Sequence, residues 1–491
     1  MGSKQHSFKS HHHSSKQFPL IRSSSTILAI SLFLASLAYL FFALKDLKEP
    51  FFWAEESYNN NKFSGDLRDA KFAWNKLCFG ATNEKLKLAV FSKSWPIGSD
   101  PGGMERHAST LYTALAARGH EIHVFTVPSD KWPHENLHDG NLHVYFAPNE
   151  YGKLNCTEAF EIFHKETKQR GGFDYVHTES VSLPHWRTKM VPKVAVTWHG
   201  IWYEIMHSKL FQELLENPRG DRPAPMLELQ EAMPRLIDEI RFFPSYSEHI
   251  CISDSAGEVL VNIYQVPKRN VHIILNGVDE SRFMYDRKSG EEFRQKHGVP
   301  SNATLILGVA GRLVKDKGHP LLFEAFSSII NRYPGVFLLV AGSGPWGNRY
   351  AELDKNVKVL GALDPSELSK FYNALDLFVN PTLRPQGLDL TLMEAMHCGK
   401  PVLTPNFPSI SRSVVLNEGF GYTFSPNVRS FVEALEFAIA DGPEVLQKKG
   451  MVCRKYAVSM FTATKMALAY ERFFLCMKNS RYCHYPLPTD C

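Results

Sequence analysis

The segment Lys85–Val127, KLKLAVFSKSWPIGSDPGGMERHASTLYTALAARGHEIHVFTV, decides the fold of this 491-residue chain. It begins with a short apolar strand and continues through a glycine-rich turn into a helix with apolar positions at Leu111, Leu115 and Ala116. A glycine ends the helix, and a second apolar strand follows at Ile122–Val127. This order predicts a β-α-β unit, in which the two strands lie parallel in one sheet.

Strand and helix patterns alternate along most of the remaining chain. Further strands are predicted at FDYVHTES, KVAVTWHG, HICISDSA and NVHIILNGV, and a second series runs through ATLILGVAGRL, VFLLVAGSG, NVKVLGAL, DLFVNPT and KPVLTP. Helical patterns such as HPLLFEAFSSIINRY separate the strands of the second series. Because the chain is too long for one core, we predict an α/β protein with two Rossmann-like domains, at residues 86–285 and 286–455.

The first 85 residues differ from the rest of the chain. Residues 26–44, TILAISLFLASLAYLFFAL, carry no charge and have about the length of a transmembrane helix. Basic residues precede this run and acidic residues follow it, so the positive-inside rule predicts a signal anchor at 25–44 and a cytosolic tail at 1–24. A cleaved signal peptide is the alternative, because the small residues of ASLA offer a cleavage site. Residues 45–85 show no sustained period and are predicted to form a stem.

An anchor in this orientation predicts a single-pass type II protein of the Golgi or endoplasmic reticulum membrane, with its catalytic part in the lumen. Glycosylation sequons at Asn155 and Asn302 agree with that address. The eight cysteines include no Cys-x-x-Cys pair, which argues against a zinc or thioredoxin-like site. Cys476, Cys483 and Cys491 crowd the C-terminus, where a disulfide can form in an oxidising lumen.

The net charge excludes one class of partner. Four basic residues of the N-terminal tail account for the whole formal charge of +4 (4 − 4 = 0), so a nucleic acid is not an expected partner. The run His11–His13 lies in serine-rich sequence, which is more typical of a tail than of a metal site.

Three residues of the first domain lie at strand ends. Gly102 and Gly103 lie where a strand leads into a helix, so backbone N–H groups there can receive an anion or a hydroxyl-rich ligand. Paired glycines also serve simple tight turns, and the dinucleotide pattern Gly-x-Gly-x-x-Gly is absent. His199 follows the strand VAVTW, where the carboxyl edge of a parallel sheet faces the ligand crevice. A packed or solvated histidine is the alternative.

Two cations follow the first strand of the second series. In GVAGRLVKDKGHP, Arg312 and Lys317 leave the strand end five residues apart. Cations that project into one crevice suit a diphosphate, because arginine forms forked hydrogen bonds and lysine acts as a point charge. Their position at a strand end supports this prediction, since a bare pair of surface cations would mean little.

Six motifs in order resemble the family 4 retaining glycosyltransferases of GT-B architecture. They are GGMERHASTLYTALAARGHEIHVFT, SDSAGEVL, NGVDESRF, GRLVKDKG, AGSGP and MEAMHCGKPV, and the resemblance extends from about Leu86 to about Phe474. It implies two Rossmann-like domains that face a central cleft, the first for the acceptor and the second for a nucleotide sugar. A C-terminal helix at 456–478 would cross back to the first domain, followed by a tail at 479–491. The resemblance also implies hexosyl or pentosyl transfer with retention, without a cofactor or a metal ion.

The resemblance assigns roles to residues of this chain. Gly102 and Gly103 would border the phosphates and sugar of the donor, and His199 would face the transferred sugar. Arg312 and Lys317 would hold the diphosphate, and Glu394 would accept hydrogen bonds from the ribose hydroxyls. The predicted catalytic residues are His199, Arg312, Lys317, Gln386 and Asp389. The predicted donor-binding residues are Gly102, Gly103, Arg312, Lys317, Gly387, Leu390, Thr391 and Glu394.

The segment NPTLRPQGLDLTLMEAMHCGKPV departs from the family pattern, which reads Glu-Gly-Phe-Gly and a second glutamate further on. Gln386 replaces the first glutamate, keeping an acceptor oxygen but losing the negative charge. If that carboxylate binds a sugar hydroxyl, Gln386 can replace it; if it stabilises positive charge on the sugar, activity falls steeply. Asp389 replaces the second glycine, either as a relocated acid that binds the sugar or as a solvated loop residue.

We therefore predict a membrane-anchored retaining glycosyltransferase. Its expected partners are a nucleoside-diphosphate sugar, with UDP as the expected carrier, and a glycan, glycolipid or polysaccharide acceptor. The alternative is a catalytically silent GT-B protein that binds a glycan or acts as a scaffold for another transferase, which Gln386 and Asp389 would favour.

Overall fold

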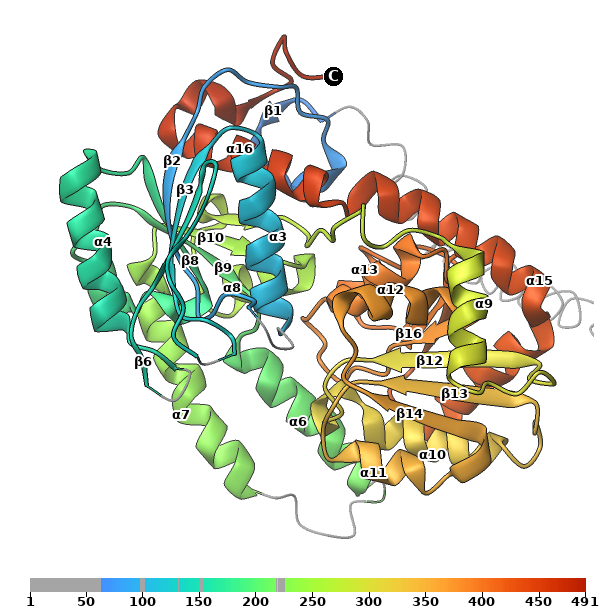
Figure 1. Ribbon diagram of the computed structural model, residues 1–491. Coiled ribbons are helices and arrows are strands. Elements are labelled where there is room, and N and C mark those ends of the chain that lie inside the picture. Colours follow the sequence, from blue (N-terminus) through green and yellow to red (C-terminus); the bar gives the residue numbers. More distant parts are fainter. Residues whose placement is uncertain (1–62, 98–101, 131, 151–152, 218, 220–225) are drawn as a thin grey trace, which may run out of the picture. The chain divides into compact units, whose positions relative to one another are not determined.

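The computed structural model describes residues 63–97, 102–130, 132–150, 153–217, 219 and 226–491 (Figure 1). The predicted cytosolic tail (1–24) and anchor (25–44), and residues 45–62 of the predicted stem, lie outside these ranges. Within the described ranges, no helix is both long and apolar enough to cross a bilayer.

An eight-stranded sheet forms the N-terminal lobe, in the order β11-β10-β9-β8-β2-β3-β5-β4. All neighbouring strands are parallel except β4, which runs antiparallel to β5. Almost every residue of the central strands is buried, because helices cover both faces of a parallel sheet. The strands are β2 (Lys87–Phe91), β3 (Glu121–Thr126), β4 (Leu137–Asp139), β5 (Leu142–Phe146), β8 (Tyr175–Glu179), β9 (Val194–Trp198), β10 (Glu248–Cys251) and β11 (Val271–Ile273). The helices are α3 (Gly103–Ala117), α4 (Cys156–Arg170), α5 (His185–Thr188), α6 (Trp202–Glu216), α7 (Met226–Phe242) and α8 (Asp254–Asn262).

A six-stranded parallel sheet forms the C-terminal lobe, in the order β14-β13-β12-β15-β16-β17. This is the order of a doubly wound Rossmann sheet. Its strands are β12 (Leu305–Ala310), β13 (Val336–Ala341), β14 (Val357–Gly361), β15 (Leu377–Val379), β16 (Val402–Pro405) and β17 (Gly421–Phe424). Its helices are α9 (Arg287–Lys296), α10 (His319–Ile329), α11 (Trp346–Ala351), α12 (Pro365–Asn373), α13 (Leu390–His397), α14 (Pro408–Ser411) and α15 (Val428–Met460). The prediction of two Rossmann-like α/β lobes is confirmed.

The last long helix, α16 (Ala463–Lys478), packs in the core of the N-terminal lobe (Figure 1). Tyr470 and Phe473 are fully buried there. The chain reaches this helix through a backbone pairing at Val278, whose N–H donates to Phe461 O at 2.9 Å and whose carbonyl accepts from the Ala463 N–H at 2.8 Å. The chain therefore passes between the lobes twice at the same place, once near Val278 and once at residues 461–463.

Residues 63–85, predicted as part of a stem, instead fold onto the N-terminal lobe. Trp74 and Leu77 are buried in its core, and Asn75 bonds to the backbone of Leu275 at 2.7 and 3.1 Å. A disulfide joins Cys78 to Cys491, and a second joins Cys476 to Cys483. Short 3-10 turns carry the buried side chains, so no helical or strand period marks this segment in the sequence.

Candidate active site

The C-terminal sheet reverses its strand order between β12 and β15, and doubly wound folds bind ligands at the carboxyl ends of the strands at such a point. The loop after β12 carries Arg312 and Lys317, and the loop after β15 carries Gln386 and Asp389. The fold therefore brings two loops that are far apart in sequence to one edge of the sheet.

Lys317 and Asp389 form an ion pair across these two loops. The second oxygen of Asp389 accepts a hydrogen bond from Asn380 Nδ2 at 3.2 Å, and the side chain does not cap α13, although Asp389 is its N-cap residue. Burial raises the pKa of Asp389, but the charge and hydrogen bond of Lys317, together with Arg384 and Asn380, outweigh burial and hold that pKa below its ordinary value. Asp389 is therefore not a solvated loop residue: it neutralises the lysine that we predicted would meet a diphosphate.

Arg312 does not join this pair. Its side chain is exposed, and among the described residues it has no hydrogen-bond or ion-pair partner. His319 lies 3.2 Å from its backbone oxygen. The guanidinium is therefore uncommitted, while Lys317 is held by a carboxylate.

Glu394 is buried at the junction of the two lobes. Its Oε1 accepts a hydrogen bond from Arg106 Nη1 at 2.5 Å, and its Oε2 accepts one from Tyr372 at 2.7 Å. Arg106 belongs to α3 in the N-terminal lobe, so this ion pair links the lobes. A pocket of about 440 Å³ adjoins it. Both lobes line this pocket: Pro96, Arg106, Ser109, Thr110, Gly277, Val278, Asp279, Arg282, Phe283, Asp364, Pro365, Leu390 and Glu394.

Gln386 is held in place by the N-terminal lobe. Ser253 Oγ donates to its backbone oxygen at 2.6 Å, and its Nε2 lies 3.4 Å from His207 Nδ1. Its Oε1 is buried without a hydrogen-bond partner among the described residues. Such an acceptor costs about 1–3 kcal/mol when left unpaired, so a hydroxyl of a bound ligand would stabilise it.

Glu204, from α6, reaches the same region. It is buried, and its Oε2 lies 3.6 Å from Arg384 Nη2. Burial raises the pKa of Glu204, and the charges of Arg384 and Lys317 oppose that rise. A Cβ at position 387 would lie 2.5 Å from Glu204 Oε1, so a side chain there would displace the Glu204 carboxylate. Leu390 and Thr391 follow at the start of α13.

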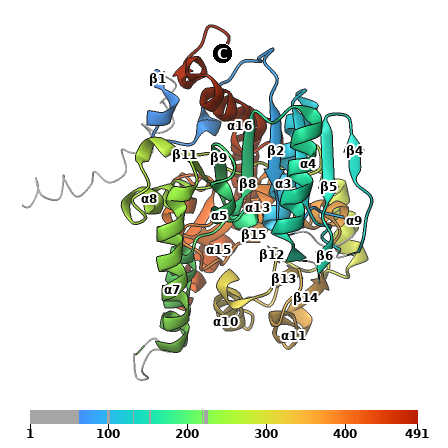
Figure 2. The ribbon, with the colours of Figure 1, turned by 90° about the vertical axis from the view of Figure 1, so that its left-hand side faces the viewer.

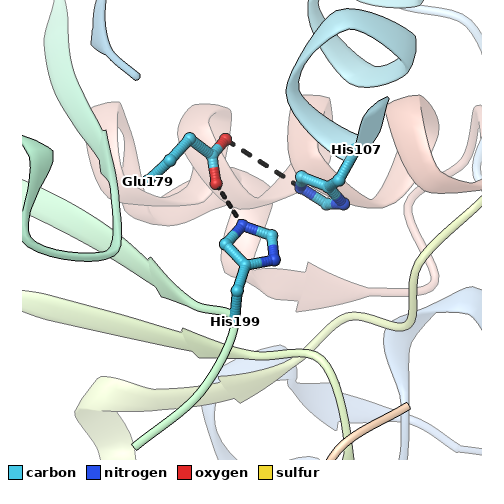
Figure 3. A group of neighbouring side chains, drawn as sticks. All are labelled: His107, Glu179 and His199. Atoms are coloured by element: carbon cyan, nitrogen blue, oxygen red, sulfur yellow. Dashed lines mark hydrogen bonds and ion pairs between the residues drawn. The ribbon is translucent and has the colours of Figure 1, made fainter. Parts of the chain in front are cut away.

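His107, Glu179 and His199 meet on the N-terminal side (Figure 3). Glu179 ends β8, His199 follows β9, and His107 lies in the second turn of α3. The predicted site residues Gly102 and Gly103 are the N-cap and the first residue of this helix. His199 Nε2 lies 2.5 Å from Glu179 Oε2, while His107 Nε2 lies 3.9 Å from Glu179 Oε1.

The charge of Glu179 determines which nitrogen of His199 carries the proton. Burial raises the pKa of Glu179, but His107 and His199 outweigh it and hold the pKa at about 2. An ionised carboxylate can only accept, so His199 Nε2 donates to it. In neutral His199, Nδ1 therefore carries the lone pair, and it points away from Glu179 (Figure 3). This nitrogen can accept a hydrogen bond or a proton from a hydroxyl group.

A buried chain of hydrogen bonds holds Glu179 from behind. Tyr112 donates to Glu179 and lies 2.6 Å from His177 Nδ1. His177 Nε2 lies 2.9 Å from Thr197 Oγ1, which lies 2.8 Å from the hydroxyl of Tyr470 on α16. The carboxylate is therefore fixed by the lobe's own core and by the helix that returns to it.

The three residues His107, Glu179 and His199 could also hold a metal ion, since their ligand atoms lie within 4.8 Å of one another. However, two ligands of one zinc ion are usually separated by roughly 3 Å or more, given Zn–N distances of about 2.0–2.1 Å. The 2.5 Å contact between His199 and Glu179 fits a shared proton better. The absence of a metal from the reaction stays a prediction.

Several of these residues were not found from the sequence. Glu179 ends the predicted strand FDYVHTES, so the strand-end rule that selected His199 also applied to it. Arg106 and His107 stand in the quoted motif GGMERH, but no local pattern indicates that they reach Glu394 and Glu179. Glu204 lies in a helix without any recognisable motif.

Acid is expected to destabilise the fold through His107. Burial lowers the pKa of His107 to about 3, against an ordinary value of 6.5, although the charge of Glu179 opposes the shift. Between these values the unfolded chain binds more protons than the folded one, so stability falls as pH falls from about 6.5. From pH 7 to pH 5 this histidine should account for about 2 kcal/mol of lost unfolding free energy. Denaturant unfolding of wild type and His107→Asn at both pH values measures it, and equal pH dependence in the two proteins would contradict the prediction.

Two family descriptions match the chain. "Glycosyltransferase Family 4" matches residues 101–282, and "Glycosyl transferases group 1" matches residues 289–458. The D-inositol 3-phosphate glycosyltransferase of Kineococcus radiotolerans is 26% identical over 354 residues, which cover 66% of this chain and 78% of that protein.

Solved structures show the same fold. Sucrose-phosphate synthase from Thermosynechococcus elongatus has a TM-score of 0.64 at 18% identity, and the match covers 80% of this chain and 100% of that one. Anabaena HepE in complex with UDP and glucose has a TM-score of 0.57 at 17% identity, with 79% and 99% covered.

The predicted location in the Golgi or endoplasmic reticulum is contradicted by these comparisons. The relatives named above are bacterial, and bacteria have neither compartment. The prediction rested on the uncharged run at 25–44, which lies outside the described residues. The sequon at Asn155 also has a structural use, because its Oδ1 caps α4 by accepting from the N–H groups of Thr157 and Glu158.

The two family matches follow the division of the fold. The first covers most of the N-terminal lobe with α3 and β8 to β11, and the second covers the C-terminal sheet and most of α15. Together they span most of the described chain. The protein therefore belongs to the GT-B glycosyltransferases of family 4, which use nucleotide sugars.

Proposed function

We propose that this protein transfers a hexosyl or pentosyl group from a UDP-sugar to a hydroxyl of a glycan, glycolipid or polysaccharide, with retention and without a metal ion. The observation that carries the proposal is that Lys317, in the loop after β12, lies where the strand order of the C-terminal sheet reverses. Anabaena HepE, which shares the fold, holds UDP and glucose, which supports UDP as the carrier.

Charge stabilisation by the C-terminal lobe would drive the reaction. Negative charge grows on the diphosphate as the glycosidic bond breaks, and fixed cations that meet it lower the barrier. Lys317 and the uncommitted Arg312 are the two cations predicted for this role. Glu394 would accept hydrogen bonds from the ribose, in place of those that it now accepts from Arg106 and Tyr372.

The N-terminal lobe would act on the sugar. His199 Nδ1, oriented by Glu179, would accept a hydrogen bond from a hydroxyl of the transferred sugar. The unpartnered oxygen of Gln386 would accept another, which a neutral side chain can do at lower strength than a carboxylate. In a front-face displacement, the leaving phosphate would take the proton of the acceptor hydroxyl, so the proposal requires no second carboxylate.

A catalytically silent protein is the second candidate, and one observation favours it. Asp389 already neutralises Lys317, so a diphosphate must compete with a fixed carboxylate for this cation. A silent protein would retain the pairing and bind no nucleotide.

Calorimetric titration of the full chain with UDP, GDP and ADP, in the presence of a chelator, tests the proposal. We expect UDP to bind most tightly and binding to persist with all divalent metal removed. Incubation with UDP-sugars, followed by NMR of the anomeric proton of the product, then tests retention. If the folded chain binds no nucleoside diphosphate, the silent alternative holds instead.

A further inference from the structure

A row of histidines crosses the outer edge of the N-terminal sheet, where β4 is the last strand (Figure 2). His123 of β3 is the register partner of His143 of β5, which is in turn the partner of His138 of β4. Directly opposed residues place their side chains on the same face of a sheet. Glu121 lies two residues before His123 and shares that face. The topology therefore gathers four side chains of the kinds that bind metals.

The ligand atoms of this row are close together. One ligand atom from each of Glu121, His123 and His143 lies within 4.8 Å of the other two. His138 Nδ1 lies 3.0 Å from His143 Nδ1, and His123 Nε2 lies 2.7 Å from Glu121 Oε1. Neighbouring ligand atoms of a tetrahedral zinc ion lie roughly 3.3 Å apart. Zinc would therefore have to widen the 2.7 Å contact between His123 and Glu121, and His138, which lies outside the trio, would have to turn toward it.

The hydroxyl of Tyr145 lies behind the His123 ring, on the side of Nδ1. Tyr145 donates its only hydroxyl hydrogen to Glu166 Oε2 at 3.0 Å, and its oxygen lies 3.1 Å from His123 Nδ1. In the tautomer whose Nδ1–H donates to the Tyr145 oxygen, the lone pair of Nε2 faces Glu121 and is available to a metal ion. Metal-binding histidines typically use their other ring nitrogen in this way.

We propose that Glu121, His123, His138 and His143 bind one Zn²⁺ ion. Three imidazoles and one carboxylate are a ligand set that zinc accepts in tetrahedral geometry. The site lies at the N-terminal ends of β3 and β5, at the opposite end of the strands from Glu179 and His199. Its role is therefore structural: it pins β4, an exposed edge strand of three residues, to the rest of the sheet.

Two cations lie near the proposed site and have carboxylate partners of their own. Lys87 Nζ lies 3.7 Å from Glu121 Oε1 and would lose this contact or shift when zinc binds. Arg170 is paired with Glu166 at 2.8 Å, so its charge is offset. No local spacing pattern indicates this site in the sequence, because its ligands are spread over three strands.

Cobalt substitution of the full chain tests the proposal. The background protein carries His6, His11, His12 and His13 replaced by serine, so that the N-terminal histidines cannot bind the probe. We expect chelator-treated protein to take up one Co²⁺ with the intense visible absorption of tetrahedral cobalt, and to lose that absorption when Zn²⁺ is added. The double variant His138→Ala/His143→Ala should show no such spectrum, whereas His484→Ala, an exposed histidine on β18 (His484–Tyr485), should be unchanged.

A milder variant separates metal binding from packing. Tyr145→Phe keeps all four ligands but removes the oxygen behind His123, so zinc affinity should fall by about 10- to 100-fold. A folded background protein that shows no tetrahedral cobalt spectrum would overturn the proposal, as would equal zinc affinity in the double variant. Nucleotide binding tests the proposed transferase function separately, because the two sites lie at opposite ends of the sheet.

Discussion

Lys317→Ala is expected to lower kcat/KM for the UDP-sugar by about 10²- to 10³-fold. Lys317 stands at the reversal point of the C-terminal sheet, where the leaving diphosphate would gain negative charge. Of the two cations predicted to hold the diphosphate, only the exposed Arg312 would remain in this variant. Steady-state kinetics with the best donor measures the loss, and calorimetry should show weakened UDP binding.

Lys315→Ala is the matched control. Lys315 lies in the same 3-10 turn (Lys315–Lys317), but its Nζ pairs with Glu216 at 2.6 Å on the surface. Its replacement should change kcat/KM by no more than about twofold, as expected for a surface substitution. Equal kcat/KM in Lys317→Ala and wild type would remove the basis of the proposed mechanism.

Asp389, the ion-pair partner of Lys317, can have either of two roles, and the variant Asp389→Asn distinguishes them. If Asp389 only competes with the diphosphate, Asp389→Asn should tighten UDP binding by about tenfold, because a charge-assisted contact is released. If it is a relocated acid that binds the sugar, the same variant should keep UDP binding and lose transfer.

Glu179→Gln is expected to lower kcat by about 10²- to 10⁴-fold. The amide has the shape of the carboxylate, but it no longer requires His199 Nε2 to be the donor, so Nδ1 loses its assigned lone pair. Because the donor diphosphate is held by the other lobe, UDP affinity should change little. The measurement is kcat over a pH series, together with UDP titration of the same variant.

Glu471→Gln controls for the loss of a buried charge in the same lobe. Glu471 is buried on α16 and pairs with Arg118 at 2.5 Å and His120 at 3.3 Å. Its neutralisation should lower stability and leave kcat nearly unchanged in the folded fraction. An equal fall of kcat in both variants would mean that Glu179 acts only through stability.

The alternation of strands and helices could be predicted along the chain because burial between two helical layers makes each parallel strand a short apolar run. The same rule located His199 and Lys317, since each follows such a run at the carboxyl edge of a sheet, whereas Asp389 was found from its departure from the family pattern. It would have located Glu179 as well. It could not recognise residues 63–85, where isolated side chains such as Trp74 pack from short turns.

By itself, then, the sequence determined two α/β lobes, the family and the strand ends that carry the candidate site. Only the tertiary structure decided the partners: Asp389 for Lys317, Arg106 for Glu394, and Glu179 for His199. Each pair joins residues from separate elements, and two of the three partners belong to loops or lobes far apart in sequence. Local spacing reports which face of an element is buried, whereas charge pairing depends on which elements pack together.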